Sequence, residues 1–168
     1  REHCELAQIG LRVVESVSLA DDMISSSRIR KLVQAGEVAL AGQLLARPYR
    51  VRGIVERGAA RGAAIGFPTA NLAAIESLIP GFGVYAGRTH WEGRDWPAAI
   101  HVGSNPTFEE NEVKFEVHLV GFKGDLYGQT LEVDIMERIR EVQTFDSKES
   151  LQEQLRQDVQ QAAQLQTK

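Results

Sequence analysis

A glycine-rich stretch is the part of the sequence whose residue types best suit chemistry. Gly58, Gly62 and Gly66 recur at four-residue spacing with Arg61 among them, so bare backbone N–H groups can approach an anion such as phosphate. The stretch is not a Walker loop or a dinucleotide fingerprint, because the residues that define those motifs do not follow. On glycine content alone, an exposed hairpin loop is the simpler interpretation.

The end of this loop carries a hydroxyl and a carboxamide. Thr69 and Asn71 follow Pro68, and in an extended segment two such side chains point to one face, about 7 Å apart. Neutral oxygens of this kind suit Mg²⁺, which keeps waters and takes its other ligands from substrate phosphates. The alternative is a turn network in which both side chains satisfy backbone groups.

Glu116 is the candidate general base. It shares the polar side of an expected strand with Lys114 and His118, opposite Val113, Phe115, Val117 and Leu119. A carboxylate on a rigid strand can accept a proton if another segment covers it; a solvated surface residue is the alternative. His101 and His118 are expected to be structural or peripheral. No HExxH, CxxC or Gly-x-Ser-x-Gly pattern supports zinc or serine-nucleophile chemistry.

The elements that position these residues are mostly strands. From Tyr49 onward the apolar period is two, which predicts strands over 96–102, 113–119 and 131–135. Turn signals at 80–83, 91–95 and 123–125 suit antiparallel connections, so an antiparallel barrel or sandwich is expected.

Helices are expected at both ends. Ser25-Ser26-Ser27 can cap a helix that ends at Gly36, and a second helix over 38–45 should stop before Pro48, with Leu40, Leu44 and Leu45 inward. The apolar residues of 11–17 allow a strand. Asp146 is expected to cap a terminal amphipathic helix in which Leu151, Leu155 and Val159 repeat every fourth residue.

Composition limits the class of protein. The 168 residues are 43% hydrophobic and 25% charged with a net charge of −4, which is typical of a globular chain and argues against nucleic-acid binding. Neither a run of 18 apolar residues nor a signal peptide is present, so no membrane partner is expected. Cys4 stands alone, and Asn105-Pro106-Thr107 is no glycosylation sequon; both favour the cytoplasm. The first residue, Arg1, suggests a fragment.

Six motifs in order resemble riboflavin kinase, specifically the C-terminal kinase module of the bacterial bifunctional enzyme that makes FMN and FAD. They are Arg47-Pro48-Tyr49, Gly66-Phe67-Pro68-Thr69-Ala70-Asn71-Leu72, Gly83-Val84-Tyr85-Ala86, Asn105-Pro106-Thr107-Phe108, Glu116-Val117-His118-Leu119 and Asp125-Leu126-Tyr127-Gly128. The resemblance implies that residues 47–168 form a six-stranded antiparallel Greek-key barrel with a C-terminal helix.

The same resemblance implies the reaction and its residues. ATP with Mg²⁺ would phosphorylate the terminal ribityl hydroxyl of riboflavin, giving FMN and ADP. Thr69 and Asn71 would bind Mg²⁺ and nucleotide phosphate, and Glu116 would deprotonate the attacking hydroxyl. The cofactor-binding loop would comprise Gly58, Arg61, Gly62, Gly66, Phe67 and Pro68 along with Thr69 and Asn71. The flavin slot is expected after residues 105–108 and at the entry to the terminal helix.

One departure from the family concerns an arginine. Many relatives have Gly-Thr-Arg-Pro-Thr where this chain has Gly103-Ser104-Asn105-Pro106-Thr107. Any role of that cation would pass to Arg88, Arg138 or Arg140.

Residues 1–46 carry a second resemblance. Ile24-Ser25-Ser26-Ser27-Arg28-Ile29-Arg30 is similar to the last phosphate-binding motif of the adenylyltransferase module that precedes the kinase, and helix N-terminal groups suit an anion. We therefore expect residues 1–46 to be the end of such a module. Its paired histidines are absent, since His3 stands alone, so FAD synthesis is not expected of this chain. The alternative function is a non-catalytic flavin- or nucleotide-binding barrel; Glu116 alongside Thr69 and Asn71 favours an enzyme.

Overall fold

The computed structural model of the chain describes residues 2–15, 17–19, 22–105 and 110–165. Five helices and eight strands occur among these residues. In chain order they are α1 (Glu2–Leu6), β1 (Ser18–Leu19), β2 (Asp22–Met23), α2 (Ser26–Ala35), α3 (Val38–Leu45), β3 (Tyr49–Glu56), α4 (Arg61–Ala64), β4 (Ala70–Ala73), β5 (Gly83–Trp91), β6 (Arg94–Asn105), β7 (Glu110–Leu119), β8 (Thr130–Arg140) and α5 (Lys148–Gln164). None of the described helices is both long and apolar enough to cross a bilayer.

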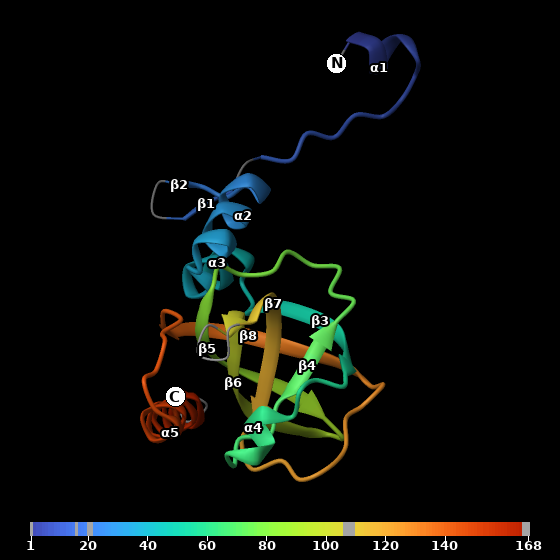
Figure 1. The fold of residues 1–168 in the computed structure, drawn as a ribbon. Helices are drawn as coiled ribbons and strands as arrows, with labels where there is room; N and C mark the ends of the chain where they lie inside the picture. Colours follow the sequence, from blue (N-terminus) through green and yellow to red (C-terminus); the bar gives the residue numbers. More distant parts are fainter. Residues whose placement is uncertain (1, 16, 20–21, 106–109, 166–168) are drawn as a thin grey trace.

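Six strands close into a barrel in the order β3-β4-β7-β6-β5-β8, and every neighbouring pair is antiparallel. Helix α5 lies beside the barrel and α4 lies near one end of β4 (Figure 1). The predicted fold class, a six-stranded antiparallel barrel with a C-terminal helix, is confirmed. Closure removes exposed sheet edges from the strands that carry the candidate site.

The barrel interior holds the predicted apolar faces. Alternate residues of each strand point inward, and the most buried of these include Ile100, Val102, Val117, Val133 and Ile135. Val113 was expected on the inner face of β7 but is 48% exposed, because it lies beyond the regular pairing that ends at Gly103 and Lys114. Because inward and outward residues alternate, the outward residues of the same strands lie on the barrel surface, where they can form a site.

Two short helices cover one end of the barrel. Ser25 caps α2 through a hydrogen bond from the N–H of Arg28, and Gly36 ends it in the left-handed region, as predicted. Helix α3 has its predicted bounds, but its buried residues are Val38, Ala41 and Leu44, while Leu40 and Leu45 are half-buried. The N–H of Gly81 donates to the carbonyl of Val33 over 2.9 Å and ties α2 to the barrel.

The prediction of a strand within residues 11–17 is wrong. The described residues of that segment form no strand, and Val13 and Val14 are 62% and 81% exposed. Only Ser18 and Leu19 pair, with Asp22 and Met23. The apolar residues have no neighbouring strand to pack against within the described chain, and the segment reaches away from the barrel (Figure 1).

The terminal helix begins one residue later than expected. Ser147, not Asp146, is the N-cap, and its Oγ accepts a hydrogen bond of 3.1 Å from the N–H of Ser150. A hydroxyl and a carboxylate both cap helices well, so the sequence alone does not choose between adjacent candidates.

Candidate functional site

Three polar side chains form a row across the outer face of β4, β7 and β6. Asn71 pairs with Glu116, and Glu116 pairs with His101. Directly opposed residues have Cβ atoms about 5 Å apart and point to the same side of the sheet. The inward neighbours of this row, among them Ala70 and Val117, are buried in the barrel. The carboxamide and the carboxylate are therefore adjacent on one outer surface.

Thr69 joins this row because it lies two residues before Asn71 on the chain. All three of Thr69, Asn71 and Glu116 line the same cavity. The structure thus brings together the three side chains that the sequence singled out. Their geometry permits the expected chemistry.

Two glycines let the loop approach these side chains. A Cβ on Gly58 would lie 2.3 Å from the side-chain nitrogen Nδ2 of Asn71, and one on Gly62 would lie 2.3 Å from the backbone carbonyl oxygen of Phe67. Real Cβ atoms do not come this close, so any other residue would displace Asn71 or Phe67. These glycines are explained by close approach to the site.

The loop contains a helical turn that the glycine spacing did not predict. Residues 61–64 form the single turn α4, and the N–H groups of Ala64, Ile65, Gly66 and Phe67 donate to carbonyls of that turn. Alanine has the highest helix propensity, and this loop contains four alanines, at positions 59, 60, 63 and 64. Those four N–H groups are already engaged, so they are not bare donors for phosphate.

A cavity of about 140 Å³ lies between this face of the barrel and α5. Its wall on the α5 side includes the apolar residues Leu151, Leu155 and Val159 along with Asp158, and the three apolar residues are those predicted to repeat along the helix. Val142 and Phe145, in the segment that leads into α5, extend this wall. The lining therefore combines the polar side chains of the barrel face with apolar side chains from α5 and the segment before it.

A buried ion pair holds α5 over the cavity. Asp158 is 1% exposed, and the guanidinium of Arg140 donates to it through Nε and Nη2 at 3.0 and 2.7 Å. Gln154 Nε2 adds a hydrogen bond of 3.0 Å. Of the three arginines considered as substitutes for the missing family arginine, only Arg140 lines the cavity. Asp158 could not be predicted from local sequence patterns, because its partner Arg140 lies 18 residues away.

Both histidines of this face belong to the cavity, whereas the sequence suggested structural or peripheral roles. Burial lowers the pKa of His101, and the nearby Glu116 carboxylate partly opposes that shift. Burial also lowers the pKa of His118, whose hydrogen bond to the carbonyl of Pro68 partly opposes it. The signal that could have placed His118 here was its two-residue spacing from Glu116.

The predicted binding residues divide into two groups. Those that line the cavity are Arg61, Gly62, Phe67, Thr69, Asn71 and Glu116. Gly58 and Pro68 contact the lining through Asn71 and His118, while Gly66 is exposed with a φ of +91°. The flavin-slot motif at residues 106–108 lies outside the described residues; the other part of that expectation, the entry to α5, lines the cavity.

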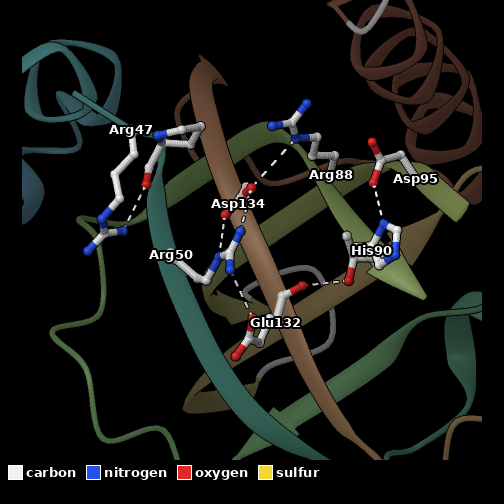
Figure 2. Close-up of polar contacts among 9 residues, drawn as sticks. Arg47, Arg50, Arg88, His90, Asp95, Glu132 and Asp134 are labelled. Atoms are coloured by element: carbon white, nitrogen blue, oxygen red, sulfur yellow. Dashed lines mark hydrogen bonds and ion pairs between the residues drawn. The ribbon is translucent and has the colours of Figure 1, made fainter. Parts of the chain in front are cut away.

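A second group of charged residues lies on the opposite side of the barrel, on β3, β5 and β8. Asp134 accepts hydrogen bonds from Arg50 Nε at 2.6 Å and Nη2 at 3.0 Å, and Arg88 Nε lies 3.5 Å from it. Glu132 accepts from Arg50 as well, over 3.0 Å (Figure 2). The hydrogen bond to Asp134 is the main cause that raises the pKa of Arg50. Arg88 therefore cannot replace an arginine beside the cavity.

The residues around the cavity suit a cation that brings most of its own ligands. Among the described residues, no group of three or more His, Cys, Asp or Glu side chains could hold a metal ion. Thr69 and Asn71 offer neutral oxygens at the cavity wall, and Gly58 leaves room for the carboxamide. This donor set fits Mg²⁺ with phosphate oxygens and water, and it does not suit zinc.

Comparison with known proteins identifies the family. Residues 45–166 match the family Flavokinase, described as riboflavin kinase. The bifunctional riboflavin kinase/FMN adenylyltransferase of Bacillus subtilis (strain 168) is 38% identical over 157 residues, which cover 91% of this chain and 50% of that protein. The chain spans about half the length of the curated relatives it matches.

Two solved structures share the fold. A crystal structure named macrolide-efflux protein, from Streptococcus pneumoniae, is 40% identical with a TM-score of 0.77, and the match covers 86% of this chain and 48% of that one. Riboflavin kinase from Trypanosoma brucei is 22% identical with a TM-score of 0.52, over 72% of this chain and 81% of that one. The fold, the ordered motifs and the match over residues 45–166 agree, and the chain belongs to the riboflavin kinase family.

Proposed function

We propose that this chain transfers the γ-phosphoryl group of ATP to the terminal ribityl hydroxyl of riboflavin, giving FMN and ADP. The observation that carries the proposal is the direct pairing of Asn71 with Glu116 on the outer face of β4 and β7. It puts a cation ligand and a base side by side at a cavity to which α5 contributes apolar side chains. A phosphoryl acceptor with a polar chain and a flat apolar ring fits such a cavity.

Glu116 is the catalytic residue in this proposal. Its carboxylate accepts the proton of the ribityl hydroxyl while the hydroxyl oxygen forms a bond to the γ-phosphorus and the bond from that phosphorus to the β–γ bridging oxygen breaks. The rigid position of Glu116 within β7, between Asn71 and His101, favours this role because positioning supplies much of phosphoryl-transfer catalysis.

Thr69 and Asn71 would hold Mg²⁺ together with the nucleotide phosphates. When bound, Mg²⁺ would offset the negative charge of the phosphate oxygens. Arg61 and Gly62 line the cavity beside them and would contact the phosphates. This assignment uses the loop residues near the cavity and leaves Gly66 as a turn residue.

The isoalloxazine ring would lie against the apolar wall made by α5. Leu151, Leu155 and Val159 provide that wall, and the ion pair between Arg140 and Asp158 keeps it in place. Burial of a flat ring against aliphatic side chains is favourable at roughly 25 cal/mol per Å² of apolar surface. The ring and the ribityl chain would then meet the apolar and polar sides respectively.

Residues 1–46 would be the end of an upstream adenylyltransferase module, and 47–168 the kinase barrel. The family match begins at residue 45, whereas the bifunctional relative matches over 91% of the chain. Exposed apolar side chains at Leu6 and Val14 are consistent with contacts to such a module. Because the lone Cys4 cannot form an internal disulfide, the cytoplasm is the expected compartment.

The test is an incubation of the chain with riboflavin, ATP and MgCl₂, followed by chromatography for FMN. We expect FMN and ADP in equal amounts, and no FMN when ATP is omitted or Mg²⁺ is chelated. Binding of riboflavin without any FMN would instead support the alternative, a non-catalytic flavin-binding barrel. A Glu116→Gln variant that bound both substrates but made no FMN would assign the chemistry to this cavity.

A further inference from the structure

His118 contacts the backbone just before the two candidate cation ligands. Its Nδ1 lies 2.8 Å from the carbonyl oxygen of Pro68. A carbonyl oxygen only accepts hydrogen bonds, so Nδ1 carries the hydrogen and donates it. Continuing the register from the pair Ala70 and Val117 brings Thr69 level with His118. The imidazole therefore lies beside the first residue of the proposed cation site.

The carbonyl of Pro68 has no partner in the sheet. Strand β4 begins at Ala70, and no backbone hydrogen bond reaches the Pro68 carbonyl from any residue that the structure describes. The pyrrolidine ring fixes φ of Pro68, which leaves ψ as the one soft dihedral before Thr69. The direction of the carbonyl reports that ψ, so the hydrogen bond from His118 fixes the backbone that aims Thr69.

His118 also contacts the residue on the other side of Pro68. The rings of His118 and Phe67 meet edge to face, with centroids 5.8 Å apart and an interplanar angle of 67°. Phe67 is joined to the turn α4 by its N–H, which donates to the carbonyl of Gly62 over 2.8 Å. One imidazole thus connects β7 to both the glycine loop and the start of β4.

The tautomer of His118 follows from this contact. Nδ1 faces an acceptor, so the single hydrogen of the neutral ring lies on Nδ1. The other nitrogen, Nε2, is then unprotonated.

We propose that His118 is a positioning residue, whose Nδ1–H holds the Pro68 carbonyl and thereby aims Thr69 at the cavity for binding of a magnesium-bound nucleoside diphosphate or triphosphate. The inference rests on the proposed function, since it concerns the nucleotide side of the same cavity. It differs from a general packing role in that it depends on one donor at one ring position.

Two substitutions separate the donor from the ring. In His118→Asn the amide nitrogen can occupy the position of Nδ1, so the hydrogen bond can be retained. In His118→Phe the aromatic contact with Phe67 can persist but the donor is lost. His90→Phe is the matched control, because His90 lies exposed on the opposite side of the barrel, where its Nδ1 lies 2.8 Å from Asp95.

The experiment measures Mg-ADP and riboflavin affinity of the 168-residue chain by titration calorimetry, with folding checked by circular dichroism. We expect His118→Phe to weaken Mg-ADP binding about 3- to 10-fold, the range for one lost hydrogen bond. His118→Asn should recover most of that loss, and riboflavin affinity should change less than about twofold. His90→Phe should bind like the wild type.

Equal losses in the Asn and Phe variants, or equal losses for both ligands, would overturn the inference. If His118→Phe does not fold, ¹⁵N NMR of the wild-type imidazole decides: Nδ1 protonated and Nε2 bare supports the inference, and the reverse tautomer contradicts it. Neither measurement requires turnover. If the variants show these differences in Mg-ADP affinity but the chain makes no FMN, the proposed kinase activity is contradicted and the role of His118 in nucleotide binding is still supported.

Discussion

Two sides of the same barrel carry charged residues, and they differ in how those charges are used. On β3, β8 and β5, Asp134 and Glu132 bind the arginines of neighbouring strands (Figure 2). On β4, β7 and β6, no ion pair within the described residues engages Glu116, which borders a cavity instead. A carboxylate already matched by cations contributes to the fold, whereas one beside an open space remains available to a substrate. The contrast is between carboxylates that are paired with arginines and a carboxylate that borders a cavity.

The largest difference between the two sides should appear when one carboxylate on each is neutralised. Glu116→Gln should lower kcat for FMN formation by about 10²–10⁴, the usual effect of losing a general base, because the variant keeps the shape but not the proton acceptor. Glu132→Gln, a matched change on the other side, should leave kcat within about twofold. The measurement is FMN formed per unit time at saturating substrates.

Comparable turnover by the Glu116 variant would remove this residue from the proton transfer. A loss in both variants would point to a general effect on folding, which thermal unfolding of the two proteins would reveal.

The second comparison concerns the two aspartates that bind arginines. Asp158 and Arg140 are both nearly buried, with side chains 2% and 14% exposed, so Asp158→Asn should lower the free energy of unfolding by about 3 kcal/mol. Asp134→Asn should cost only about 1 kcal/mol, because its partner Arg50 is 48% exposed and water screens the pair. Urea unfolding measures both.

The two aspartate variants should also differ in substrate affinity. Asp158→Asn loosens the helix that forms the apolar wall of the cavity, so KM for riboflavin should rise, while Asp134→Asn should leave it unchanged. The reverse ranking, in either stability or KM, would show that α5 is not held over the site by this ion pair.

The features that were predicted correctly are those encoded locally. The period of two in 96–102 and 131–135 predicted the barrel strands, and Ser25 with Gly36 predicted the bounds of α2. Such signals need only a residue and its chain neighbours. The choice of Ser147 over Asp146 as a cap shows the limit of that approach, since two adjacent residues satisfied the same rule.

The features that the sequence did not reveal depend on register between distant segments. Glu116 and His101 were visible as strand residues, but their pairing depends on how β6 and β7 align. The partner of Asp158 is likewise fixed by how α5 lies relative to Arg140 at the end of β8. The helical turn within the glycine loop was missed for a different reason: its alanines favour a helix, whereas the spacing of its glycines predicts an irregular loop.

The third prediction concerns the neutral ligands on the site side. Asn71→Ala should weaken Mg-ADP binding about 10- to 100-fold, the range expected when a hydrogen-bonding or ligand group for a charged partner is removed. Thr130→Ala, on the opposite side of the barrel, is the control and should have no effect. Titration calorimetry measures the ADP affinity of both variants with and without Mg²⁺. An Asn71 variant with unchanged Mg-ADP affinity would contradict the cation-site assignment.

The smallest expected effect is a pH dependence of stability that belongs to the site side. The pKa values of His101 and His118 are both lowered by burial, so the folded protein keeps these rings neutral while the unfolded chain takes up protons near pH 6.5. Their contribution to stability is fully present above that pH and is lost as the pH falls through the lowered pKa values of the folded protein. From pH 7.5 to 6 the loss should stay below about 1 kcal/mol for each histidine.

Two substitutions test this pH dependence. His101→Gln and His118→Asn retain a nitrogen donor at the positions of Nε2 and Nδ1, which face the carbonyls of Ser104 and Pro68, but cannot titrate. The double variant should therefore lose less stability than the wild type over this interval in urea unfolding, and an identical fall in both proteins would show that these rings do not titrate differently on folding.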